Sequence, residues 1–345
     1  MKHLELVTTG GTIGSIFAQD SLSVDPSERR IALEVQKAKR RLGYTVNVTS
    51  ALNLNSEDFC PGDWAAVLAA VDAAHEKSPD GVVVTHGTDT LAYTASALSC
   101  FEQRWPSKTI LTGAYNPPDH SSSDTSINLL AALQFAAADH PANGTFVAFR
   151  SSASNNRAQI LRAAQLKPMQ FDDVYFLGSY GESVAIFSPN EGLVVDTSLS
   201  HPRMPALNAV KTLPDAHAIR SASNRVALLK VYPGIDPMLL AAASESRDVV
   251  VVEMYHSGTG PTADGPNSIV QVIETLSKSK TVLMGTVPSR FIPTPYESTR
   301  KLVRAGALVV RDIQPHYLFT LSVLNFSCGN DRDQLAQTLR PWLMS

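Results

Sequence analysis

The chain has 345 residues, 44 % of them hydrophobic and 18 % charged, so it can bury the core of one large or two medium-sized globular domains. Its net charge of −3 and its lack of a dense Lys/Arg stripe argue against a nucleic-acid-binding surface. No apolar run reaches the length of a membrane-spanning helix, so we expect no membrane insertion.

The cysteines and the N-terminus indicate the compartment. Cys60, Cys100 and Cys328 are odd in number and widely spaced, which gives neither a disulfide framework nor a metal-ligand pair. The first residues pass directly into an apolar strand pattern and leave no room for a signal peptide. These observations predict a reducing compartment and a cytoplasmic protein.

Taken in chain order, the first half of the sequence alternates short β-branched runs with longer helical patterns. The predicted strands lie at 4–7, 44–52, 81–85, 109–112 and 145–150. The predicted helices lie at 31–42, 61–77, 90–100 and 126–138, the last with Asp124 as its cap. Such alternation is typical of βαβ units, so we expect an α/β fold with a mostly parallel sheet flanked by helices.

Between these elements, residues 16–29 show no clear period. They are predicted to form a loop, either a lid over a site at the preceding strand end or a plain surface connection.

The second half of the chain indicates a second, smaller α/β domain. Residues 151–188 are less regular. The next predicted strands lie at 226–231, 248–255 and 281–284, and the helices at 238–243, 267–277 and 296–305. We therefore predict an N-terminal catalytic domain over 1–195, a linker rich in Pro, Ser and His over 196–224, and a C-terminal domain over 225–345.

Two loops rich in Gly and Thr each follow a predicted strand, at 8–15 (TTGGTIGS) and at 85–90 (THGTDT). Ligands of open α/β sheets bind beyond the carboxyl ends of strands, so both loops are expected to face one small molecule. A Thr hydroxyl becomes a nucleophile when it is activated, and glycines let backbone N–H groups approach an oxyanion. The alternative is that these threonines only cap strand ends and form turns.

Several common catalytic motifs are absent from the sequence. It contains no Walker-type phosphate loop, no Gly-x-Gly-x-x-Gly, no His-Glu-x-x-His and no Gly-x-Ser-x-Gly. This argues against the common types of NTPase, nicotinamide oxidoreductase, zinc hydrolase and serine hydrolase.

The two loops together resemble a known family. TGGTI at 9–13 and HGTDT at 86–90, each after a strand, are similar to the two signature motifs of the bacterial-type L-asparaginases. Further similarities are Ser56-Glu57-Asp58 followed by Trp64, Gly113-Ala114, and Ser123-Asp124 followed by Asn128-Leu129. The resemblance covers the whole N-terminal domain and is weaker in the C-terminal one.

The resemblance implies roles for individual residues. Thr12 would attack the side-chain amide carbon and form an acyl-enzyme, while Thr88 and Lys167, with Asp89 beside them, would form a second hydroxyl–base arrangement. Substrate binding is implied for Asp89 and Glu57 on the α-ammonium, for Ser56 and the N–H groups of Gly11 and Gly87 on the α-carboxylate, and for Ala114 on the amide.

The lysine assignment depends on the spacing chosen. The family's Arg-x-x-x-Lys pattern, laid on Arg157, places Leu161 where the lysine belongs. Counting back from the aromatic residues downstream selects Lys167 instead. A buried lysine beside Thr88 would have a lowered pKa and act as a base. The alternatives are that Lys167 is a plain surface lysine and that the base lies within 155–162.

The sequence departs from the family pattern in two places. The family's lid carries a tyrosine that bonds the first threonine, but no tyrosine lies between Ile13 and Arg41. The C-terminal segment that reaches a neighbouring subunit's substrate reads Gly-x-Gly-Asn in the family and Ser-Gly-Thr-Gly at 257–260, where Thr259 would replace the Asn. Both departures concern the substrate more than the reaction class.

The resulting expectation is an amidohydrolase that converts L-asparagine to L-aspartate and ammonia without metal or organic cofactor. The family further implies a homodimer or homotetramer with sites at the subunit interface. One alternative is a hydrolase of another amide, such as glutamine, a D-amide or an N-substituted aspartate or asparagine derivative. Another is a catalytically weak homologue that only binds an amino acid.

Overall fold

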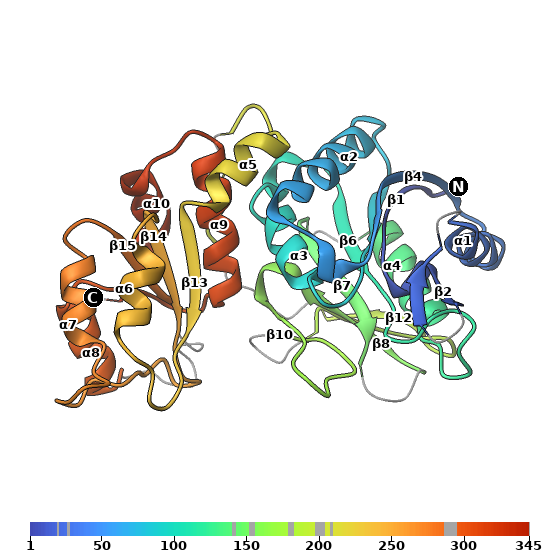
Figure 1. Cartoon of the computed structure of the whole chain (residues 1–345). Helices are drawn as coiled ribbons and strands as arrows, with labels where there is room; N and C mark the ends of the chain where they lie inside the picture. The colour runs from blue at the N-terminus through green and yellow to red at the C-terminus, as the bar shows by residue number, and fades with distance from the viewer. Residues whose placement is uncertain are drawn as a thin grey trace. The chain divides into compact units, whose positions relative to one another are not determined.

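The structure is a computed structural model that describes residues 1–18, 21–25, 28–139, 143–151, 156–178, 183–196, 204–207, 210–285 and 295–344. The chain divides into two compact units, Met1–Arg203 and Met204–Ser345 (Figure 1). This division falls inside the predicted linker at 196–224. Part of that segment does not act as a linker, because Ala216–Ser223 form helix α5 of the second unit.

The first unit contains a sheet with the strand order β12-β11-β8-β7-β6-β5-β1-β4 among its described residues. Its parallel strands are β1 (His3–Gly10), β4 (Thr45–Leu54), β5 (Gly81–Thr85), β6 (Lys108–Thr112) and β7 (Thr145–Arg150). Its antiparallel strands are β8 (Ala158–Arg162), β11 (Ala185–Ser188) and β12 (Gly192–Val195). The predicted α/β fold with a mostly parallel sheet is confirmed.

Helices cover both faces of this sheet (Figure 1). Helices α1 (Arg29–Leu42) and α4 (Thr125–Ala137) pack on one face, and α2 (Trp64–Glu76) and α3 (Leu91–Ser99) on the other. On the α4 side, Phe135 meets Phe146 of β7 edge-on at 4.9 Å between ring centroids, within a continuous apolar core. Because both faces are covered, the inner strands β5 and β6 are buried along their whole length.

Short strands occupy two segments for which the sequence predicted none. In 16–29, predicted to be a loop, β2 (Ser15–Ala18) and β3 (Ser21–Val24) pair as an antiparallel hairpin. In 151–188, β8 and β11 belong to the large sheet, and β9 (Leu166–Lys167) pairs with β10 (Leu177–Gly178). Strands of two to four residues are too short to produce a readable period, and in the five-residue β8 the polar Gln159 and Arg162 interrupt the apolar run.

The second unit is a smaller sheet, with the parallel strands β13 (Val226–Lys230), β14 (Val249–Glu253), β15 (Thr281–Gly285) and β16 (Leu308–Val310). Helices α5 and α9 (Pro315–Ser327) pack on one face, while α6 (Met238–Ser244), α7 (Val270–Leu276) and α8 (Glu297–Arg304) pack on the other. Helix α10 (Arg332–Leu339) follows. The sequence patterns did not predict β16, α9 or α10.

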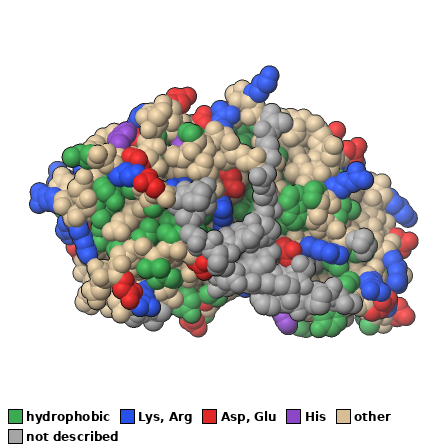
Figure 2. Space-filling view, turned by 180° about the vertical axis from the view of Figure 1, so that it is seen from behind, with side chains coloured by type: hydrophobic (Ala, Val, Ile, Leu, Met, Phe, Trp, Pro, Cys, Tyr) green, Lys and Arg blue, Asp and Glu red, His purple; other side chains and the backbone are tan. Residues whose placement is uncertain are grey.

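No helix in the described ranges combines the length and the apolar character needed to cross a membrane. On the face drawn in Figure 2, Lys and Arg side chains lie among Asp and Glu side chains rather than in a single stripe.

Candidate active site

The first two predicted loops meet at a pair of glycines. Strands β1 and β5 are neighbours, with Thr8 opposite Thr85 at their carboxyl ends. Beyond these residues Gly11 adopts φ +83°, and a Cβ built on it would lie 2.3 Å from the backbone nitrogen of Gly87. Only glycine fits this position, because it combines a left-handed φ with backbone contact. The loops at 8–15 and 85–90 are therefore in direct contact.

A third strand end joins them through Ser56. Strand β4 ends at Leu54, and Ser56 begins a 3₁₀ turn directly after it. The buried Ser56 hydroxyl accepts from the Asp89 backbone N–H at 3.3 Å, and its oxygen lies 3.3 Å from Asp89 Oδ2. The Thr90 hydroxyl donates to the Ser56 carbonyl at 2.8 Å. These bonds fix the Thr85–Thr90 loop against the turn that carries Glu57.

The predicted hydroxyl groups and the predicted carboxylates of the site differ in their exposure to solvent. Thr12 and Thr88, each one residue beyond a contacting glycine, are half-buried, whereas the carboxylates of Asp89 and Glu57 are exposed. Hydroxyls held by rigid backbone with charged groups open to solvent beside them suit a small zwitterionic ligand.

His86 holds the backbone of this site in place and does not face the solvent-accessible part of it. It is fully buried, and its Nδ1 lies 2.8 Å from the Gly87 carbonyl, which can only accept, so Nδ1 carries the proton. Nε2 then accepts from the Thr94 hydroxyl at 2.8 Å. Burial lowers the pKa of His86 to about 4, so the ring is neutral near pH 7. With both nitrogens occupied, His86 has a structural role rather than a catalytic one.

The fourth strand end carries Ala114. Gly113 directly follows β6 and packs tightly against His86. A Cβ built on Gly113 would lie 2.4 Å from the His86 carbonyl oxygen. The Asn128 amide donates to the Gly113 carbonyl at 3.0 Å from helix α4. Ala114 is buried beside this contact, so the carboxyl ends of β1, β4, β5 and β6 all converge.

The prediction that Asp124 caps the helix after it is wrong in detail. Asp124 occupies the cap position of α4, but its carboxylate makes no capping bond to that helix. It accepts instead from the backbone N–H groups of Tyr115, at 3.0 Å, and Asn116, at 2.9 Å. The Asp124 carboxylate therefore bonds the loop after β6 instead of the end of α4. Sequence spacing alone does not reveal this preference.

Lys167 does not lie in the buried environment that the base assignment needed. It is exposed on β9, paired through the backbone with Leu177, and its ammonium makes no hydrogen bond or ion pair among the described residues. At the other position considered, Leu161 is buried in β8. Lys167 was selected by counting back from downstream residues that include Tyr180 and Gly181, and these two lie outside the described part of the chain.

Thr259 belongs to the second unit and lies in a turn after β14. Its carbonyl accepts from the Tyr255 N–H at 3.0 Å, and its hydroxyl lies 3.1 Å from that of Ser257. The Thr299 hydroxyl donates to the Gly258 carbonyl at 2.8 Å, which holds the turn closed.

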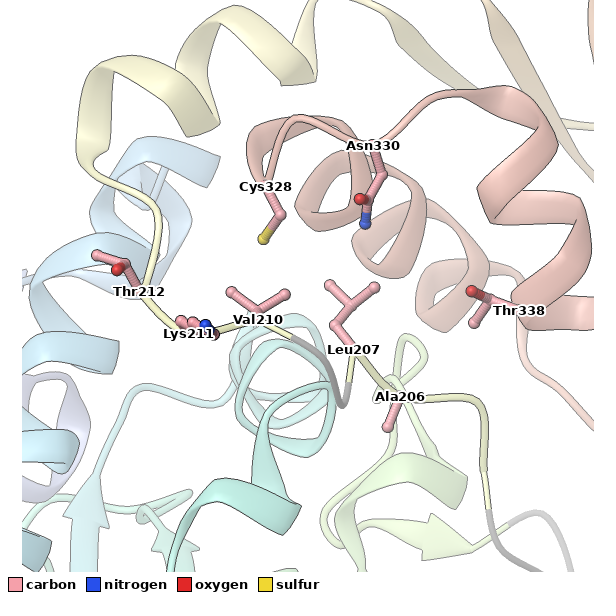
Figure 3. A pocket seen from close by; sticks show the side chains of 8 residues that line it. All are labelled: Ala206, Leu207, Val210, Lys211, Thr212, Cys328, Asn330 and Thr338. Atoms are coloured by element: carbon pink, nitrogen blue, oxygen red, sulfur yellow. The ribbon is translucent and has the colours of Figure 1, made fainter.

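The second unit also contains a cavity of about 530 Å³ (Figure 3). It is lined by Ala206, Leu207, Val210, Lys211, Thr212, Cys328, Asn330 and Thr338. Burial raises the pKa of the Cys328 thiol to about 11, which keeps it protonated near neutral pH. The described lining residues include no carboxylate or imidazole and therefore do not offer an activated nucleophile.

One residue beside the site escaped sequence reasoning. Arg150 ends β7, and its side chain is only 4 % exposed. The available signal was a charged residue at the end of the apolar run at 146–149. No group of three or more His, Cys, Asp or Glu side chains in the described ranges is arranged to hold a metal ion.

The fold and the converging loops define a two-unit α/β protein with a hydroxyl-rich site at the carboxyl edge of its larger sheet. Comparison with known proteins agrees with this class and narrows it. The family model described as "Asparaginase, N-terminal" matches residues 3–190. An L-asparaginase of Thermococcus kodakarensis is 30 % identical over 335 residues, which cover 96 % of this chain and 94 % of the relative.

The chain belongs to the asparaginase family and is a hydrolase of amide bonds, as the sequence motifs predicted. A glutamyl-tRNA(Gln) amidotransferase subunit of Methanosphaera stadtmanae is 25 % identical over 92 % of this chain and 70 % of the relative. Among solved structures, the thermostable L-asparaginase of T. kodakarensis superimposes with a TM-score of 0.77 at 24 % identity, covering 98 % of this chain and 96 % of that one. L-asparaginase I of Vibrio cholerae gives a TM-score of 0.74 at 21 % identity, covering 98 % and 97 %.

Proposed function

We propose that this amidohydrolase cleaves the side-chain amide of L-asparagine, releasing L-aspartate and ammonia. The observation that carries the proposal is the backbone contact of Gly11 with Gly87, which joins the loops bearing Thr12 and Thr88. The similarity to a protein named L-asparaginase over nearly the whole chain supports the same substrate.

In this proposal the Thr12 hydroxyl attacks the amide carbon while its proton passes to a base. The C–N bond then breaks, ammonia leaves with a transferred proton, and the acyl group remains as an ester on Thr12. Water attacks the ester with the help of Thr88 and frees L-aspartate. Backbone N–H groups of the glycine-rich loops stabilise the oxyanion in both steps.

The remaining site residues hold the substrate. The exposed carboxylates of Asp89 and Glu57 would bind the α-ammonium, and Ser56 with the N–H groups of Gly11 and Gly87 the α-carboxylate. Ala114 would place the amide.

Lys167 remains the proposed base for Thr88. In a single chain its side chain is exposed rather than buried beside Thr88. The alternative location of the base is the segment 155–162.

We also propose that the chain acts in the cytoplasm as a homodimer or homotetramer, in which Thr259 takes part in a site at the subunit interface. The proposal is supported by the turn of the second unit in which Thr259 is hydrogen-bonded, and by the resemblance of the sequence at 257–260 to the family's intersubunit segment.

A second function is hydrolysis of a different amide, such as glutamine, a D-amide or an N-substituted aspartate or asparagine. The lid segment without tyrosine and Thr259 in place of Asn favour it. Similarity to a protein named as part of a glutamyl-tRNA(Gln) amidotransferase points the same way. The exposure of Lys167 would instead favour a catalytically weak binding homologue.

Ammonia release from a panel of amides separates these functions. We expect fast release from L-asparagine by the unmodified chain, and a loss of at least about 10³-fold in Thr12→Ala, because a nucleophile is removed. The exposed Thr49→Ala on β4 is the matched control and should keep full activity. Release only from another amide would establish the second function, and binding without release the third.

Lys167→Met tests the base in the same assay. A loss of about 10³-fold is expected if Lys167 activates Thr88. Near-normal activity would disprove the lysine assignment and move the search to 155–162.

A further inference from the structure

Arg150 is a buried cation placed between three segments of the first unit. Its Nε donates to the Val174 carbonyl at 2.5 Å and lies 3.8 Å from Asp124 Oδ2. Its guanidinium lies 4.8 Å from the centroid of the Tyr115 ring, within the range of a cation–π contact. Its charge is therefore shared between a carbonyl, a carboxylate and an aromatic face.

The carboxylate that faces Arg150 holds the loop after β6. Asp124 is fully buried and accepts from the N–H groups of Tyr115 and Asn116 and from the side-chain amide of Asn128, all between 2.9 and 3.1 Å. Asn128 in turn donates to Gly113. A buried carboxylate needs a compensating cation, and Arg150 is the cation that the structure brings to it.

The third segment that Arg150 contacts lies between β9 and β10. Val174 lies between β9, which carries Lys167, and β10. One guanidinium thus connects the loop that presents Ala114 with the segment that follows Lys167. Arginine suits this place because its planar head can donate and stack at the same time.

We propose that Arg150 is a positioning residue that fixes the 113–116 loop, and with it Ala114, for the amide reaction. The inference rests on the proposed function for its effect on rate. Its effect on the order of the loop does not depend on the proposed function, because the hydrogen bonds to Asp124 form whatever the substrate is.

Arg150→Gln is the main test, read out by hydrogen–deuterium exchange of peptides covering 113–124 and by kcat and KM for L-asparagine. We expect exchange in these peptides to accelerate by about tenfold, since Asp124 loses its cation and the loop opens more often. We expect kcat to fall about 100-fold with a smaller change in KM, the size typical of a misplaced reacting group.

The matched control is Arg225→Gln in the second unit. Arg225 also pairs with an aspartate, Asp248, at 2.6 Å and stacks on a ring, Phe326, at 3.9 Å. It should leave exchange at 113–124 and kcat unchanged, which separates positioning from the general loss of a stacked ion pair.

Arg150→Lys should recover part of kcat, because it returns the charge without the planar head. If Arg150→Gln does not fold, Tyr115→Leu removes the half-exposed ring that covers the guanidinium and is read in the same way. Unchanged exchange and unchanged kcat in the folded variants would overturn the proposal while leaving the amidase function intact. Absence of activity in the unmodified chain would reject the proposed function, and the exchange experiment would still decide the role of Arg150.

Discussion

At the scale of single residues, Gly11 sets how closely the two hydroxyl loops approach. Its φ of +83° and the 2.3 Å distance from a Cβ to the Gly87 nitrogen combine backbone strain with a clash against backbone atoms. We expect Gly11→Ala to abolish amide hydrolysis and to lower the free energy of unfolding by more than about 3 kcal/mol.

The chain offers a control that separates strain from clash. Gly43 has φ +68°, but nothing lies within 4 Å of a Cβ built on it. Gly43→Ala should therefore cost only about 1 kcal/mol and leave the activity intact. Urea denaturation and ammonia release measure both variants. Equal stability losses in the two would show that the Gly11–Gly87 contact is not tight.

Single residues also show where sequence reasoning reaches its limit. The loops with Thr12 and Thr88 were predictable because Gly and Thr after an apolar run are a local signal at a parallel strand end. The hydrogen-bond partner of Asp124 was not predictable, because both α4 and the 113–116 loop offer N–H donors and only the folded structure decides which of them bonds the carboxylate. The exposure of Lys167 and the contacts of Arg150 likewise depend on the segment 151–188, in which the sequence pattern predicted no helix or strand.

At the scale of elements, the β2–β3 hairpin is held where the sequence predicted a loop. The Asp25 N–H after β3 donates to the Gly14 carbonyl at 3.2 Å, and the Asn53 amide of β4 donates to the Asp25 carbonyl at 3.0 Å. These two bonds tie the end of the hairpin to the strand ends of the site. We propose that the hairpin is the lid that the sequence offered as one alternative, and that the Asn53 bond helps to hold it at the strand ends.

Asn53→Ala removes one of these two bonds. We expect faster hydrogen–deuterium exchange in peptides covering 15–25 and a higher KM, with a stability loss near 1 kcal/mol, the usual net value of one hydrogen bond. Asn47→Ala is the matched control, because Asn47 lies near the start of the same strand and bonds Glu5 there. If both variants gave the same exchange at 15–25, Asn53 would not hold the hairpin.

The elements that were predicted share one property, and those that were missed lack it. The five parallel strands of the first sheet are short β-branched runs or, in β4, an alternating run, and periodic helices separate them, so local pattern and tertiary role agree. Helix α9 is buried on nearly all sides and shows no polar face, so its period is hidden. The two-residue strands β9 and β10 exist only through their pairing with each other.

At the scale of the whole molecule, buried neutral imidazoles couple folding to pH. Burial lowers the pKa of His75 and of His86 to about 4, and that of His316 to about 3, against 6.5 for a free imidazole. His75 and His86 lie in the first unit and His316 in the second. Both units therefore carry a group that the unfolded chain protonates more readily than the folded one.

The sign of the effect follows from proton binding. Between pH 6.5 and about 4 the unfolded chain binds protons at these imidazoles and the folded chain does not, so stability falls as the pH falls through this window. Each of His75 and His86 should contribute about 3 kcal/mol of this loss by the acid end of the window. Above pH 6.5 the same groups are neutral in both states and contribute no slope.

His75→Gln tests this coupling away from the site. His75 lies on α2, with Nε2 2.9 Å from the Thr109 hydroxyl and its ring stacked on Trp105, so glutamine keeps a polar partner for Thr109 without a titrating group. We expect the variant to lose less stability than the unmodified chain between neutral pH and the acid end of the window, by about 3 kcal/mol. Urea denaturation at both pH values measures this difference. His217→Gln, the same substitution at an exposed histidine on α5, is the matched control for replacing a histidine. A pH dependence in His75→Gln equal to that of the unmodified chain would mean that His75 binds its proton equally well in the folded and unfolded states.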